Sequence, residues 1–183
     1  MVQDVSPRDV LDFWFAAGKE KWFAKDDAFD AEITSRFKNA HEAARDGGFD
    51  DWTRTAEGAL ALIILLDQFP RNMYRGSPDM FAADDKAIEV TRQSLDLKYD
   101  GDVPLAARQF IYMPLMHSER LEDQELCVQL FEADSALEDN VPFAIEHRDI
   151  IAKYGRFPHR NSVLGRTSTA EEEAYMEGDG FKG

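Results

Sequence analysis

Apolar residues recur along this chain at intervals of three and four, the spacing that places side chains on one face of an α-helix. The stretch 27–45 is the clearest case, with Phe29, Ile33, Phe37 and Ala44 in register. Alternation with a period of two, which is typical of half-buried strands, is nearly absent. The pattern therefore predicts an all-α protein.

Capping residues and glycines indicate where the helices begin and end. Ser6 and Pro7 begin the first helix, because serine caps a helix and proline suits its first position. Further helices are expected over residues 27–45, about 78–98, about 103–117, about 121–137 and 140–155, and a last short helix begins with a capping box of Ser168 and Glu171. Pro114 is expected to kink or end its helix, because proline lacks a backbone donor.

The apolar run ALALIILL at 59–66 fits a buried strand or a buried helix by periodicity alone. Its alanine and leucine content, together with Thr55 and Glu57 just before it, favours a helix. The run is too short to span a bilayer. Because the connections are short, successive helices are expected to lie antiparallel, as a stack of helical hairpins or a compact bundle. We expect one domain over 1–176 and a frayed tail over 177–183.

Composition and charge exclude several classes of function. The 183 residues contain 36 Asp and Glu against 21 Lys and Arg, a formal net charge of −15. Such a surface repels nucleic acid and anionic lipid, so neither is an expected partner. The single cysteine, Cys127, excludes an intrachain disulfide. The N-terminus lacks a basic segment followed by an apolar one, so a cytoplasmic location is expected, and no cofactor is predicted.

One segment departs from the acidic character of the rest. Residues 147–166 hold five Arg and Lys against one acidic residue, Asp149. A cationic segment in an acidic protein indicates an anion site, although pairing with surface acids would explain it equally well. Helical spacing places His147 on an apolar face with Phe143, Ile150, Ile151 and Tyr154, so His147 is expected to point inward.

Two other helix ends carry polar residues. Asp67 and Gln68 directly follow the apolar run, in LLDQFPRN, and a buried Asp67 needs a partner. The candidates are Arg71, Arg156 and Arg160. His117 and Glu119 follow the kinked helix, where they either line a pocket or hold a structural turn.

Together these helix ends contain acids, amides, histidines and arginines, the residue types that a polar pocket needs. The candidate ligand-binding residues are Asp67, Gln68, Arg71, Asn72, His117, Glu119, Gln124, His147, Asp149, Arg156, His159, Arg160 and Asn161. They match no recognised catalytic signature. We expect the three segments to converge in space, because lone burial of each would be unfavourable.

Three hypotheses for function remain open. The first is a pocket for a small anion or a peptide carboxylate, which suits planar guanidinium groups. The second is an enzyme in which His117 or His147 works with Glu119 or Asp149 as acid and base, or in which these four residues are metal ligands. The third is a protein-interaction scaffold, with a protein partner, in which the polar motifs are structural.

At these motifs the chain resembles the bacterial domain-of-unknown-function 924 family. The resemblance lies in VLDFWF at 10–15, KWFAKDDAFD at 21–30, GALALIILLDQFPRN at 58–72, MPLMHSE at 113–119, DQE at 123–125, HRDIIAKYGRFPHRNSVLGR at 147–166 and STAEE at 168–172. It implies an all-helical, mostly cytoplasmic protein with a tetratricopeptide-like arrangement of hairpins. It implies no activity.

Overall fold

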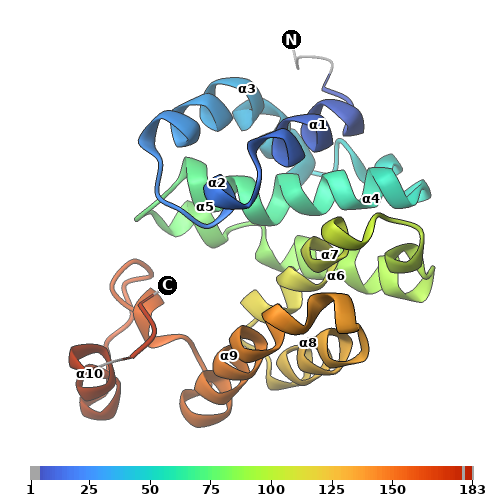
Figure 1. The fold of residues 1–183 in the computed structure, drawn as a ribbon. Coiled ribbons are helices and arrows are strands. Elements are labelled where there is room, and N and C mark those ends of the chain that lie inside the picture. The colour runs from blue at the N-terminus through green and yellow to red at the C-terminus, as the bar shows by residue number, and fades with distance from the viewer. Residues whose placement is uncertain (1–4, 179, 183) are drawn as a thin grey trace. The chain divides into compact units, whose positions relative to one another are not determined.

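A computed structural model describes residues 5–178 and 180–182, and every regular element within these ranges is a helix (Figure 1). The prediction of an all-α fold is therefore confirmed. Close contacts group the chain into two compact units, one formed by residues up to Arg75 together with 79–114, and the other by 76–78 together with residues from Leu115 onward. The expectation of a single domain over 1–176 stays a prediction.

The first unit contains most of the helices. Its elements are α1 (Pro7–Ala17), α2 (Lys19–Trp22), α3 (Asp27–Arg45), the 3-10 helix η1 (Asp50–Arg54), α4 (Ala56–Ile63), the π-helical turn η2 (Ile64–Gln68), α5 (Phe69–Met73), α6 (Asp84–Asp96), η4 (Tyr99–Gly101) and the part of α7 (Leu105–His117) up to Pro114; the 3-10 helix η3 (Pro78–Phe81) precedes α6. As predicted, Ser6 caps α1 in a capping box with Asp9, and Gly18 follows its end with φ 76°.

The run 59–66 is helical, as predicted, and none of its side chains is more than 2% exposed. Thr55 caps α4 by accepting a hydrogen bond from the Gly58 amide at 3.1 Å. A Cβ atom on Gly58 would lie 2.2 Å from the carbonyl oxygen of Trp52, so the packing of α4 on η1 requires glycine here. Burial of this whole run stabilises the unit through the hydrophobic effect.

The π-helical turn at 64–68 was not predicted, and Pro70 follows it closely. The Phe69 amide donates to the carbonyl oxygen of Ile64, and the next donor in that pattern would be residue 70, which has no N–H. The Leu65 carbonyl instead accepts a hydrogen bond from Nδ1 of His41 at 2.9 Å. His41 is fully buried, and burial lowers its pKa, so the ring is neutral at pH 7.

The second unit contains the end of α7, then α8 (Leu121–Ala133), the 3-10 helix η5 (Ser135–Asn140), α9 (Val141–Tyr154), the 3-10 turn η6 (Pro158–Arg160) and α10 (Ala170–Glu177). Helices α8 and α9 pack side by side (Figure 1). Because connections between consecutive helices are short, this pair is a helical hairpin of the expected kind.

Pro114 was expected to kink or end its helix; α7 continues past it to His117, so it does not end there. Two predicted boundaries in this part of the chain were wrong. The expected helix 121–137 stops at Ala133, where Asp134 leaves the helical region and starts η5. The capping box of α10 is Thr169 with Glu172, one residue later than predicted.

The segment after α10 contains packed residues. The ring of Phe181 lies against the apolar cluster of Ile150, Ile151 and Phe157, and its amide donates to the Tyr175 hydroxyl at 2.9 Å. A Cβ on Gly180 would lie 2.3 Å from the Tyr175 carbonyl oxygen, so this close approach depends on glycine. Residues 179 and 183 lie outside the described residues, and fraying of 177–183 stays a prediction.

Candidate functional site

The LLDQFPRN segment forms a buried ion-pair cluster within the first unit. Arg71 lies 3.2 Å from a carboxylate oxygen of Asp67 and makes two hydrogen bonds to Asp84, at 3.0 and 3.1 Å. Asp67 is fully buried, and its other oxygen accepts from Nε2 of Gln68 at 2.6 Å. Arg71, one of the three partners predicted for Asp67, is in contact with it.

Asn72 completes this cluster on its other side. Its Nδ2 donates at 2.7 Å to Asp30 on α3, which also pairs with Arg75 at 2.5 Å. Burial alone would lower the pKa of Arg71, but the carboxylates of Asp67 and Asp84 outweigh it and raise that pKa. Arg71 therefore ties α5 to α6, and Asn72 ties it to α3. Gln68 bonds to its neighbour Asp67 and lies 3.5 Å from the sulfur of Met113 on α7.

The basic segment of the second unit folds into a turn that begins where Gly155 ends α9 with φ 69°. Glu119 holds this turn from the end of α7. Its carboxylate accepts from the Phe157 amide at 2.8 Å and from Arg166 at 2.8 and 2.9 Å. Burial would raise the pKa of Glu119, but the bonds from Arg166 and Phe157 outweigh burial and lower it, so the group is a carboxylate at pH 7.

A second bidentate pair ties the turn to α10. Arg156 donates to Glu172 at 2.6 and 2.8 Å, and Asn161 donates to the same carboxylate at 3.3 Å. The hydrogen bond from Arg156 is the main reason why the pKa of Glu172 is lowered to about 2. Asn161 also accepts a 2.9 Å hydrogen bond from Nε of Arg166. The alternative of pairing with acids thus describes Arg156 and Arg166.

Asp149 and Gln124 have local partners. Asp149 is exposed on α9 and accepts a 2.6 Å hydrogen bond from the neighbouring Arg148. Gln124 is fully buried, and its Nε2 donates at 2.6 Å to the carbonyl oxygens of Met116 and Ser118. Gln124 therefore satisfies carbonyl groups at the end of α7 that have no following helical turn.

Three basic side chains pack around the buried ring of Phe157. The ring centres of His147 and His159 lie 5.6 and 5.4 Å from the Phe157 centre, and the Arg160 guanidinium lies 4.5 Å from it. Arg160 also donates at 2.8 Å to the carbonyl oxygen of His117. We call Phe157, His147, His159 and Arg160 the Phe157 cluster.

The geometry fixes the tautomer of His147, which points inward as predicted and is 8% exposed. Its Nδ1 lies 2.7 Å from the Phe143 carbonyl oxygen, which can only accept, so Nδ1 carries the proton. In the neutral ring Nε2 is therefore an acceptor. The ring of Phe181 stands over both histidines, at 4.6 Å from His147 and 5.2 Å from His159.

His159 occupies an environment that disfavours its charged form. Burial lowers its pKa most, the charges of Arg160 and His147 lower it further, and the result is a pKa of about 4. Its Nδ1 atom is buried and meets no hydrogen-bond partner among the residues that the structure describes. At pH 7 the ring is neutral, and Arg160 carries the permanent positive charge of the cluster.

Within the second unit, Glu119, His147 and the backbone carbonyl of His117 contact residues of the basic turn. Convergence of Asp67 with them stays a prediction. Sequence reasoning missed Glu172, Phe157 and Arg166 as members of the network, although Arg166 belonged to the basic segment.

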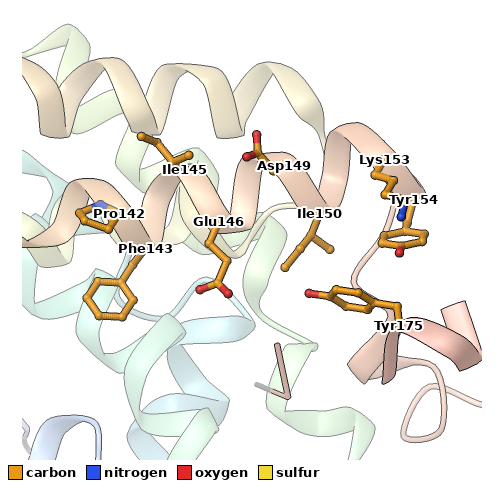
Figure 2. A pocket seen from close by; sticks show the side chains of 9 residues that line it. All are labelled: Pro142, Phe143, Ile145, Glu146, Asp149, Ile150, Lys153, Tyr154 and Tyr175. Carbon is orange, nitrogen blue, oxygen red and sulfur yellow. The ribbon is translucent and has the colours of Figure 1, made fainter. Parts of the chain in front are cut away.

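An open pocket of about 520 Å³ lies along α9 (Figure 2). It is lined by Pro142, Phe143, Ile145, Glu146, Asp149, Ile150, Lys153, Tyr154 and, from α10, Tyr175. Phe143 was placed on one apolar face with the inward-pointing His147, but it is 57% exposed at one end of this pocket. We call this pocket the α9 groove.

Neither a metal centre nor a membrane span is found in the described parts of the chain. Across residues 5–178 and 180–182, no three His, Cys, Asp or Glu side chains are placed to hold a metal ion together. The acid–base alternative stays a prediction, with Glu119 already bonded to Arg166. No helix in the same ranges has the length and apolar character to cross a membrane.

Comparison with known proteins gives the family context. The family described as a bacterial protein of unknown function (DUF924) matches residues 10–180. The chain is also similar to a solved structure of a protein of unknown function, ATU0120, from Agrobacterium tumefaciens. The two share 42% sequence identity with a TM-score of 0.87, over 93% of this chain and 96% of that one. No curated protein matches the chain.

Proposed function

The chain belongs to the DUF924 family, whose description assigns no activity, and we propose from the site itself that the Phe157 cluster binds a small anion or the carboxylate group of a peptide. The observation that carries this proposal is the packing of two histidines and one arginine around a single aromatic ring. Imidazole and guanidinium groups both donate hydrogen bonds to carboxylate and phosphate oxygens.

The electrostatics of the cluster support an anionic ligand. Arg160 lies in a 7% exposed position, where a charge interacts more strongly with a ligand than it would in water. Its contacts with the Phe157 ring and the His117 carbonyl hold the guanidinium in place. A fixed cation loses little conformational entropy when an anion binds.

Histidine protonation would couple binding to pH. Without a ligand, His159 is neutral because its pKa is about 4. A bound anion would favour the imidazolium form and raise that pKa, so binding would take up a proton. The affinity should therefore increase as the pH falls from 7 towards 5, as long as the ligand itself stays ionised.

The test uses calorimetry and thermal shift on the full chain with sodium phosphate, acetate and N-acetyl amino acids as probes. A ligand of the folded protein should raise the melting temperature in proportion to the logarithm of its concentration. Arg160→Gln should abolish this rise, whereas Arg148→Gln, which changes an arginine paired with exposed Asp149, should preserve it. If no probe raises the wild-type melting temperature, or if both variants respond like wild type, the proposal is wrong.

A further inference from the structure

The face of α9 that contains Phe143 is apolar and open, and it does not belong to the Phe157 cluster. Figure 2 shows Phe143, Glu146 and Ile150 on one side of the helix, with the Tyr175 ring from α10 facing them. Phe143, Ile150 and Tyr154 form an apolar stripe along α9, and Tyr154 packs on Tyr175 with ring centres 5.1 Å apart. The stripe is thus covered at its Tyr154 end and exposed at Phe143.

The dimensions of the α9 groove suit a helical segment. The Cα positions of residues 143 and 154 are eleven residues apart on one helix, which is a length of about 16 Å at 1.5 Å per residue. Apolar anchors at i, i+4 and i+7 of a bound helix span about 10 Å. A groove of about 520 Å³ along this length has room for side chains of leucine or phenylalanine size.

The charges beside the groove favour a basic partner. Glu146 is exposed among the apolar residues, and the chain as a whole has a net charge of −15. At the covered end, Nζ of Lys153 lies 4.8 Å from the centre of the Tyr154 ring and 3.2 Å from Glu171. Tyr154, which lines the groove, thus packs against an ammonium group, and Glu171 outside the groove pairs with that group.

We propose that the α9 groove docks a basic amphipathic helix of another protein, with apolar residues against Phe143 and Ile150 and a lysine or arginine beside Glu146. This proposal is independent of anion binding at the Phe157 cluster, because it uses the opposite charge and different side chains. It therefore adds a partner class to the ligand proposed above.

The probe is an 18-residue fluorescein-labelled peptide with leucines at helical spacing and lysines on the flanks, followed by fluorescence anisotropy with the full chain. Two matched peptides accompany it: one has glutamate in place of lysine, and one has the same composition with the leucines scrambled. The basic amphipathic peptide should bind at least tenfold more tightly than either. Equal binding of the scrambled peptide would show unspecific charge attraction and overturn the proposal, as would no binding of any peptide.

Two pairs of variants locate the site. Phe143→Ala should weaken binding about tenfold, while Leu121→Ala, which removes another exposed apolar side chain in the same unit, should leave it unchanged. Glu146→Lys should weaken binding more than Glu89→Lys, which makes the same charge change at an exposed position on α6. Equal effects within either pair would overturn the proposal. A Phe143-dependent dimer in sedimentation equilibrium would also overturn it, because a second copy of the chain would then be the occupant.

Discussion

Replacing Arg71 with methionine removes the cation at the centre of the cluster that joins α5 to α6. Asp67 is fully buried, and the side chain of Asp84 is 13% exposed, so two poorly solvated carboxylates would lose the cation that they share. Removing one partner of a buried pair costs about 3 to 5 kcal/mol. Gln68 still donates to Asp67, which favours the lower end, about 3 kcal/mol.

For a chain of this length, that loss should lower the melting temperature by about 6 to 12 °C. The assay is thermal unfolding at pH 7, followed by circular dichroism. The control is Arg8→Met, whose pair with Asp12 is 81% and 74% exposed and should change the melting temperature by about 1 °C or less.

A second substitution tests the cause of the loss. Asp67→Asn removes one of the two negative charges that Arg71 neutralises. The double variant with Arg71→Met should therefore unfold at a higher temperature than Arg71→Met alone. If Arg71→Met behaves like Arg8→Met, the reasoning fails, and Arg71 becomes available as a ligand-binding residue.

Three further outcomes are expected. In a histidine NMR titration of the folded chain, His159 should titrate near pH 4, and a midpoint near 6.5 would contradict the burial of its ring. Because the folded pKa lies below the unfolded value, the stability that His159 contributes should be lost as the pH falls from about 6.5 towards 4. Gly58→Ala should lower the melting temperature by several degrees, since its Cβ would lie 2.2 Å from the Trp52 carbonyl oxygen, whereas an unchanged temperature would mean that α4 and η1 separate without cost. Cys127 is fully buried and burial raises its pKa, so its thiol should react with a disulfide reagent only after unfolding, and fast reaction of the native chain would refute this.

Local signals account for the parts of the fold that were predicted correctly. The bounds of α3 and the start of α1 follow from capping residues and apolar spacing within a few positions of each helix end. The Asp67–Arg71 pair also lies within one helical turn in sequence. Local signals fail where two neighbouring residues are equally suited to cap a helix. Ser168 and Thr169 before α10 are such a pair, because both have a glutamate three residues later. Burial of Glu172 against Arg156 decides in favour of Thr169.

The parts of the site that were not predicted depend on contacts between distant residues. Glu119 and Arg166 are 47 positions apart, and no spacing rule connects them. The basic segment was recognised from its charge, but the charge alone could not separate Arg166, which has a carboxylate partner, from Arg160, which packs on an aromatic ring. Partner choice of this kind is decided by the tertiary fold, because arginine is equally suited to both environments.

Phe143 shows the same limit and explains why α9 can serve two surfaces. His147, four residues after Phe143, points inward, and Glu146, three residues after Phe143, is exposed. The Phe143 side chain therefore points between the buried and the open face of α9. Tyr154, farther along the stripe, is covered because α10 brings Tyr175 against it, whereas Phe143 is 57% exposed. Helical periodicity gives the direction of a side chain, but the position of a second segment decides whether it is covered. For that reason one helix can hold His147 in the Phe157 cluster and still present Phe143 to a partner.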